Sequence, residues 1–156
     1  MGSHFPPYFP LFSWSAAGSA SLVDFLIFHT GQLPPSVTLA APDNVKFIDL
    51  KDAAGFVDVH ARVATVLADG TRSKQDVENL KKILTAQFQK HPYTLVEYKP
   101  AYGHIFAEYL KPYTHWGYGD LDMVFGDIPS WVSDSELNDW DIVTYSHGDQ
   151  SSVYLR

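Results

Sequence analysis

The chain has 156 residues, which is about the length of one domain, and its 46% hydrophobic and 15% aromatic residues exclude wholesale disorder. Its formal net charge of −7 argues against a nucleic-acid-binding protein, which needs a basic face. The sequence has no run of Lys or Arg, so an anionic membrane surface is also a poor candidate partner. The absence of Cys excludes disulfides and thiolate metal sites, and neither a signal peptide nor an apolar segment of about 20 residues is visible.

Helical and strand patterns alternate along the first part of the chain. From Pro10, the spacing of Leu11 and Trp14 predicts a helix with proline in its first turn. The apolar run Val23–Phe28 predicts a strand buried on both faces, as in a parallel sheet covered by helices. Val45–Leu50 follows a turn signal and predicts a second strand.

The middle of the chain has the strongest helical pattern. Residues 53–85 are predicted to form two helices separated at Asp69-Gly70, with Ser73 as the N-cap of the second. A further helix is predicted over Ala101–Leu110, and Pro112 prevents its continuation.

The last part of the chain is predicted to contain mainly strands. One strand should reach Asp120 and a second short strand should leave Asp122. A short helix is predicted at 129–137, and strands are predicted at Asp141–Tyr145 and Ser152–Leu155. This alternation of strands with helices predicts an α/β architecture.

The segment Asp120-Leu121-Asp122 is the strongest candidate for metal chemistry. Mg²⁺ or Mn²⁺ commonly takes one or two carboxylates together with substrate phosphates, and two Asp side chains at a strand end can converge on one such ion. The surrounding residues are apolar and aromatic, where carboxylates are costly unless they are paired or bound to a cation. Asp139-Trp140-Asp141 has the same spacing but follows a polar stretch, so we interpret it as solvated surface.

The region around this acidic pair resembles the signature block of a poorly characterised family of glycosyltransferase-like proteins, whose members follow roughly the pattern KPAYG-IF--YL--Y-FWG--D-D-IFGD. The matching segments of this chain are Glu97–Phe106, Tyr109-Leu110 and His115–Ile128. Three earlier segments also fit the family pattern in order, namely Pro7–Phe12, Val23–Phe28 and Asn44–Ile48. The likeness therefore covers most of the chain, and residues 55–90 match least.

The resemblance implies a GT-A (Rossmann-like) fold over residues 1–156 as a single domain, with a mostly parallel central sheet flanked by helices. It also implies a nucleotide-sugar donor, with UDP as the default nucleotide, and a DxD metal site for Mn²⁺ or Mg²⁺. Family members begin with an additional strand and continue past the point where this chain stops at Arg156. The resemblance therefore implies an incomplete domain that lacks its first strand and the C-terminal acceptor portion, so the catalytic residues are unknown.

Four further residues are candidates for the same site. His29 and Thr30 end the first predicted strand, where α/β proteins bind ligands, and would contact the base or ribose or simply cap the strand. Lys99 corresponds by family position to a donor-site residue, or is a solvated Lys before a helix. His147 resembles a His that follows the family's DxD block and would complete the metal site, or is a loop residue.

The leading functional hypothesis is a metal-dependent glycosyltransferase that moves a sugar from a nucleoside diphosphate to a glycan or lipid-linked acceptor. A second hypothesis is a non-catalytic GT-A-like binding module or an inactive fragment. A third is a metal-dependent phosphohydrolase, although two-metal sites need more clustered Asp and His ligands than the sequence offers.

Overall fold

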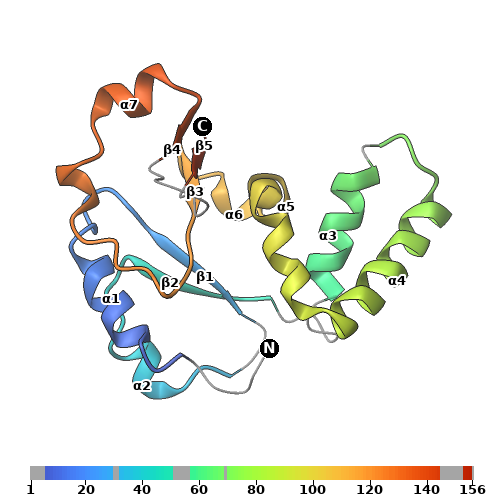
Figure 1. Ribbon diagram of the computed structural model, residues 1–156, viewed down its shortest axis with the longest axis horizontal. Helices are drawn as coiled ribbons and strands as arrows, with labels where there is room; N and C mark the ends of the chain where they lie inside the picture. The colour runs from blue at the N-terminus through green and yellow to red at the C-terminus, as the bar shows by residue number, and fades with distance from the viewer. Residues whose placement is uncertain (1–5, 30–31, 51–56, 69, 145–152, 156) are drawn as a thin grey trace. The chain divides into compact units, whose positions relative to one another are not determined.

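The computed structural model describes residues 6–29, 32–50, 57–68, 70–144 and 153–155 (Figure 1). The chain divides into two compact units. One unit comprises the described residues of Leu50–Tyr113, and the other comprises the described residues of Gly2–Asp49 and of Thr114–Arg156. Helices and strands are mixed in the described residues, so the predicted α/β class is confirmed at this level.

The unit that contains both ends of the described chain is built on a parallel pair of strands. β1 (Phe25–His29) and β2 (Val45–Asp49) lie side by side, with Phe25 opposite Val45 and His29 opposite Asp49. Helix α1 (Phe9–Ala17) precedes them with Pro10 in its first turn, and the short helix α2 (Pro35–Thr38) connects them. The predicted first helix and both predicted strands are therefore confirmed.

An aromatic cluster joins α1 to the two strands. The Phe9 and Phe12 rings stack with their centroids 5.4 Å apart, Phe12 meets Phe25 of β1 at 5.4 Å, and Phe9 meets Phe47 of β2 at 5.9 Å. Burying each such side chain contributes about 1.5–3 kcal/mol. The predicted burial of the first strand on both faces is not observed, because every residue of β1 keeps partial solvent exposure in this two-stranded sheet.

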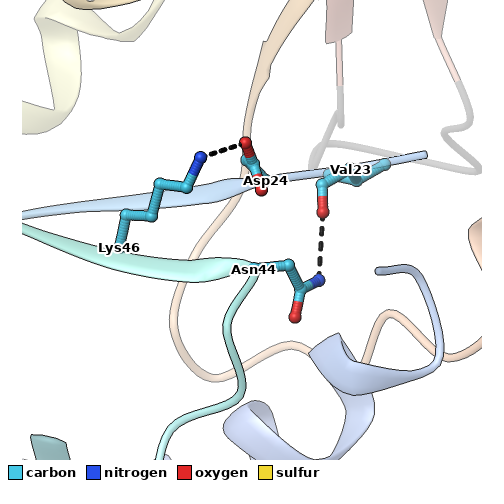
Figure 2. Close-up of polar contacts among 4 residues, drawn as sticks. All are labelled: Val23, Asp24, Asn44 and Lys46. Atoms are coloured by element: carbon cyan, nitrogen blue, oxygen red, sulfur yellow. Dashed lines mark hydrogen bonds and ion pairs between the residues drawn. The ribbon is translucent and has the colours of Figure 1, made fainter. Parts of the chain in front are cut away.

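Asn44 connects the end of α1 to the starts of both strands, and Figure 2 shows its bond to Val23. Its buried side-chain amide donates hydrogen bonds to the carbonyl oxygens of Ala16, at 2.8 Å, and Val23, at 3.0 Å. The neighbouring Lys46 Nζ lies 2.5 Å from Asp24 Oδ2 and links the two strands. Because this ion pair is substantially exposed, it contributes at most about 1 kcal/mol. The buried Asn44 amide is therefore the main polar link between α1 and the two strands.

A second sheet in the same unit is antiparallel. β3 (Trp116–Tyr118), β4 (Ile142–Thr144) and β5 (Val153–Leu155) pair in the order β3-β5-β4. The strands expected near these positions are thus present, but among the described strands parallel pairing is found only between β1 and β2, and not in most of the sheet as predicted. The connection between β4 and β5 spans residues 145–152, which is shorter than the dozen or more residues that a parallel crossover requires.

The unit at Leu50–Tyr113 is helical in its described part. α3 (Val57–Ala68) and α4 (Lys74–Lys90) are separated at Gly70, whose φ is +64°, and Ser73 forms a capping box with Asp76. These features confirm the predicted break and N-cap. Among the residues of this unit whose burial the structure describes, the buried apolar side chains are Leu50, Val63, Ala64, Ala68, Leu84, Phe88, Ile105 and Phe106.

Two of the predicted helices are divided into shorter pieces. A 3-10 helix, η1 (Pro92–Ala101), leads into α5 (Tyr102–Ile105) and α6 (Ala107–Leu110), which replace one helix over 101–110. The helix predicted at 129–137 consists of η2 (Ile128–Ser130) and α7 (Asp134–Asp139), the second capped by Ser133. Within the described ranges, no helix combines the length and the apolar character needed to cross a membrane.

Candidate functional site

The acidic pair lies in a turn that directly follows β3. After Tyr118 and Gly119 the chain turns, and Met123 N–H donates a hydrogen bond to Asp120 O at 3.3 Å. Leu121 packs against the aromatic cluster of α1, whereas Asp120 and Asp122 on either side of it are exposed. The alternation therefore directs both carboxylates outward while the residue between them holds the turn on the core.

This exposure corrects one argument drawn from the sequence. The apolar neighbours of Asp120 and Asp122 do not bury the two carboxylates, because Leu121 and Phe125 turn toward the core instead. A cation is therefore not needed to offset a desolvation penalty. An exposed pair of carboxylates can instead share an ion with a substrate, since Mg²⁺ and Mn²⁺ sites commonly keep positions open for phosphate oxygens.

The residues after the pair do not form the predicted second strand. Residues 123–127 have no regular secondary structure, and their backbone is held by the side chains of Ser15 in α1 and Ser19 just after it. Phe125 N–H donates to Ser15 Oγ at 3.3 Å, and the Phe125 ring lies 5.9 Å from Phe12 and 5.0 Å from Phe25. The acidic turn is therefore fixed at its far end by the same aromatic cluster that holds Leu121.

Ser19, just beyond α1, provides a second point at which the segment after the acidic turn is attached to the start of the chain. Its fully buried hydroxyl donates to Gly126 O at 2.6 Å and accepts a hydrogen bond from Ile128 N–H at 3.1 Å. A Cβ atom on the adjacent Gly18 would lie 3.3 Å from Gly126 O, so the two chain segments approach closely here. Sequence reasoning missed Ser15 and Ser19, and the available signal was the presence of serines in an otherwise apolar helical segment.

Two glycines bracket the turn for different physical reasons. A Cβ atom at Gly119 would lie 2.6 Å from Cζ of the packed Phe125 ring, so a side chain at this position would displace the aromatic cluster. Gly126 has φ +66°, in the left-handed region that disfavours other residues, but the space around it is open. The turn is thus restricted by packing before the carboxylates and by backbone conformation after them.

The other Asp-x-Asp segment of the chain has no comparable support. Asp139 ends α7, Trp140 is 64% exposed, and Asp141 is exposed. This arrangement agrees with the interpretation of the segment as solvated surface. Because both acidic pairs are exposed, the feature that distinguishes Asp120 and Asp122 is the packing of Leu121 between them.

The remaining predicted site residues are distributed over the chain. His29 is the last residue of β1 and pairs in register with Asp49 at the carboxyl end of β2, with its ring 6.4 Å from the Phe47 ring. Lys99 is half-buried in η1 of the helical unit. Thr30 and His147 lie outside the described residues. The structure thus brings together Asp120 with Asp122 and, separately, His29 with Asp49.

Metal ligation by three or more side chains is not observed in the described part of the chain. Among those residues, no cluster of at least three His, Asp or Glu side chains is arranged to hold a metal ion. The acidic turn therefore offers two carboxylate ligands, and the predicted third ligand, His147, stays a prediction.

Comparison with known families covers nearly the whole chain. The profile of a family described as "Family of unknown function (DUF6625)" matches residues 1–149, so the chain belongs to this family. Comparisons with curated proteins and with solved structures gave no significant match. The biochemical activity therefore has to be argued from the residues themselves.

Proposed function

We propose that the chain binds the diphosphate of a nucleotide-sugar through a divalent cation held by Asp120 and Asp122, within a GT-A-like fold, and that it acts in metal-dependent glycosyl transfer. The observation that carries this proposal is the acidic turn itself. Two carboxylates project outward from one turn, directly after a strand, and Leu121 between them packs on the core. A fixed turn reduces the ordering that ligand binding would otherwise require.

The ligand chemistry of this turn suits Mn²⁺ or Mg²⁺. Both are hard cations that prefer oxygen ligands, and the two Asp residues supply one carboxylate each. When bound, such an ion neutralises the charge of the diphosphate and stabilises it as a leaving group. The residues of this chain would fix the position of the diphosphate, because Ser15, Ser19 and Phe125 restrain the backbone that follows the carboxylates.

The parallel strands offer a position for the nucleoside. Open α/β sheets bind ligands beyond the carboxyl ends of their strands, and His29 and Asp49 lie side by side at that edge. We assign base or ribose contacts to this edge, with UDP as the default nucleotide. The sugar acceptor, a glycan or a lipid-linked sugar, is part of the same proposal, as are the donor-site roles of Thr30 and His147.

Calorimetric titration of UDP, with and without Mn²⁺, tests the proposal. Binding should depend on Mn²⁺ and should be lost in the double variant Asp120→Ala/Asp122→Ala. The double variant Asp139→Ala/Asp141→Ala is a matched control, because it removes the same charge from the other exposed acidic pair and should bind UDP normally.

The other outcomes separate the alternatives. No binding of UDP or UDP-sugars under any condition would contradict the proposal and leave a non-catalytic module or an inactive chain. Release of phosphate from simple phosphate esters, without cleavage of a UDP-sugar, would indicate a phosphohydrolase instead. Equal losses in the two double variants would show that the acidic turn has no special role.

A further inference from the structure

The residues of the acidic turn alternate between two sides of the chain. On the inward side, a Cβ atom at Gly119 would lie 2.6 Å from Cζ of Phe125, and Leu121 packs against the aromatic cluster of α1. Asp120 and Asp122 occupy the other positions and are exposed. Such alternation is the property of a strand, in which successive residues point to opposite sides. The two sides of β3 therefore continue into the acidic turn.

Tyr118 lies on the outward side, together with the two carboxylates. It is the last residue of β3 and directly precedes the inward-facing Gly119, so the alternation puts it on the same side as Asp120. Of the described side chains, neither Tyr118 nor Trp116, which shares its face of β3, belongs to those packed on the α1 cluster. Tyr118 is half-buried. Its ring is therefore supported by the protein and still keeps accessible surface.

The face of the antiparallel sheet that carries Tyr118 is open at β4. Trp116 is in register with Leu155 of β5, and Leu155 is in register with Ile142 of β4. Positions directly opposite one another on neighbouring strands lie on the same face. Ile142 is 60% exposed, so solvent reaches this face of the sheet.

A tyrosine ring beside a metal-bound diphosphate suits a sugar ring. A pyranose has faces of C–H groups that can pack on an aromatic face while its hydroxyls stay hydrated, and tyrosine combines an apolar ring with a polar tip. Tyr118 precedes Asp120 by two positions, about 7 Å along the chain at about 3.3 Å per residue. In a nucleotide-sugar the hexose is bonded directly to the diphosphate, so it has to lie next to the cation that holds that diphosphate.

We infer that the Tyr118 ring packs against the hexose of the nucleotide-sugar donor. This inference rests on the proposed function, because it needs a diphosphate bound through a cation at Asp120 and Asp122. It adds the selection of the donor. The acidic pair can hold any nucleoside diphosphate, whereas Tyr118 favours one that carries a sugar.

Calorimetric titration in the presence of Mn²⁺ tests this inference by comparing UDP with UDP-glucose, UDP-galactose and UDP-N-acetylglucosamine. Tyr118→Ala should weaken binding of the UDP-sugar that the wild type prefers by about fivefold or more and leave the Kd of UDP unchanged. Tyr118→Phe keeps the ring and should bind both ligands like the wild type.

Trp116→Ala is the matched control for this experiment. It removes an aromatic side chain from the same face of β3, but Trp116 is four positions from Asp120, about 13 Å along the chain and beyond a single hexose. Both affinities should therefore stay unchanged. Far-UV circular dichroism establishes that the variants are folded, and Tyr118→Leu, which keeps an apolar side chain without a ring, replaces Tyr118→Ala if the latter does not fold.

The remaining outcomes separate this inference from the proposed function. If UDP binds with Mn²⁺ but Tyr118→Ala weakens UDP and the UDP-sugar equally, or weakens neither, the role of Tyr118 is refuted and the proposed function stands. An equal loss of UDP-sugar binding in Tyr118→Phe would also refute packing by the ring, since only the hydroxyl is removed. A wild type that binds neither UDP nor any UDP-sugar would overturn both proposals.

Discussion

Replacement of Ser19 by Ala tests whether this serine, just beyond α1, holds the segment that follows the acidic turn. The substitution removes one hydroxyl from a fully buried position and changes little else in volume. Two backbone groups then lose their partner, the carbonyl oxygen of Gly126 at 2.6 Å and the N–H of Ile128 at 3.1 Å. Because Ile128 is also buried, water cannot readily replace the lost bond to its N–H.

The expected loss follows from these two hydrogen bonds. Each contributes about 1 kcal/mol net, and a buried donor left without a partner costs about 1–3 kcal/mol. Ser19→Ala should therefore lower the free energy of unfolding by about 3 kcal/mol. Urea denaturation followed by tryptophan fluorescence measures this change as a lower midpoint at an unchanged slope.

Ser130→Ala is the matched control for this experiment. The Ser130 hydroxyl also donates to a backbone carbonyl, Asp127 O at 2.8 Å, but it is exposed, so water can replace the bond. The control should change the free energy of unfolding by no more than about 0.5 kcal/mol. If Ser19→Ala costs no more than Ser130→Ala, the reasoning that Ser19 holds this segment is refuted.

Four further substitutions, at three positions, test other features of the two units. Gly119→Ala should lower the urea midpoint by the equivalent of about 1–3 kcal/mol, because its Cβ would lie 2.6 Å from Phe125 Cζ; a wild-type midpoint would contradict this packing. Gly126→Ala should cost about 1–2 kcal/mol through backbone strain alone, and Gly126→Asn should cost less in the same assay. The hydrogen bond from Arg62 lowers the pKa of Glu108. This pair therefore stabilises the fold above the usual carboxyl pKa and loses that effect as pH falls through the lowered pKa. The urea midpoint of Glu108→Gln should accordingly fall less steeply in acid than the midpoint of the wild type.

The sequence predicted those helices and strands that are determined by residues close together in the chain. Pro10 in the first turn of α1, the apolar run of β1 and the capping box at Ser73 each depend on residues within a few positions of one another. The metal-binding candidates Asp120 and Asp122 were also visible in the sequence, since their spacing and their position after a strand are local features.

The surroundings of that candidate site could not be predicted in the same way. Ser19 and Gly126 are 107 residues apart in sequence, and no local pattern announces their hydrogen bond. The side on which Asp120 and Asp122 emerge depends on the packing of Leu121 against a helix near the start of the chain. An apolar neighbourhood in sequence therefore did not indicate burial in space.

The division of the chain also has a consequence for the order of folding during synthesis. The helical unit is complete once Tyr113 has left the ribosome, whereas the unit that bears the acidic turn draws on Gly2–Asp49 and on residues from Thr114 onward. Domains generally fold as they emerge, and contacts across long sequence separations form slowly. During synthesis, Ser15 and Ser19 therefore lack their final backbone partners until Phe125–Ile128 has been translated. The acidic turn is accordingly among the last parts of the protein to take shape, and this interval is when the aromatic cluster is most open to aggregation and to chaperones.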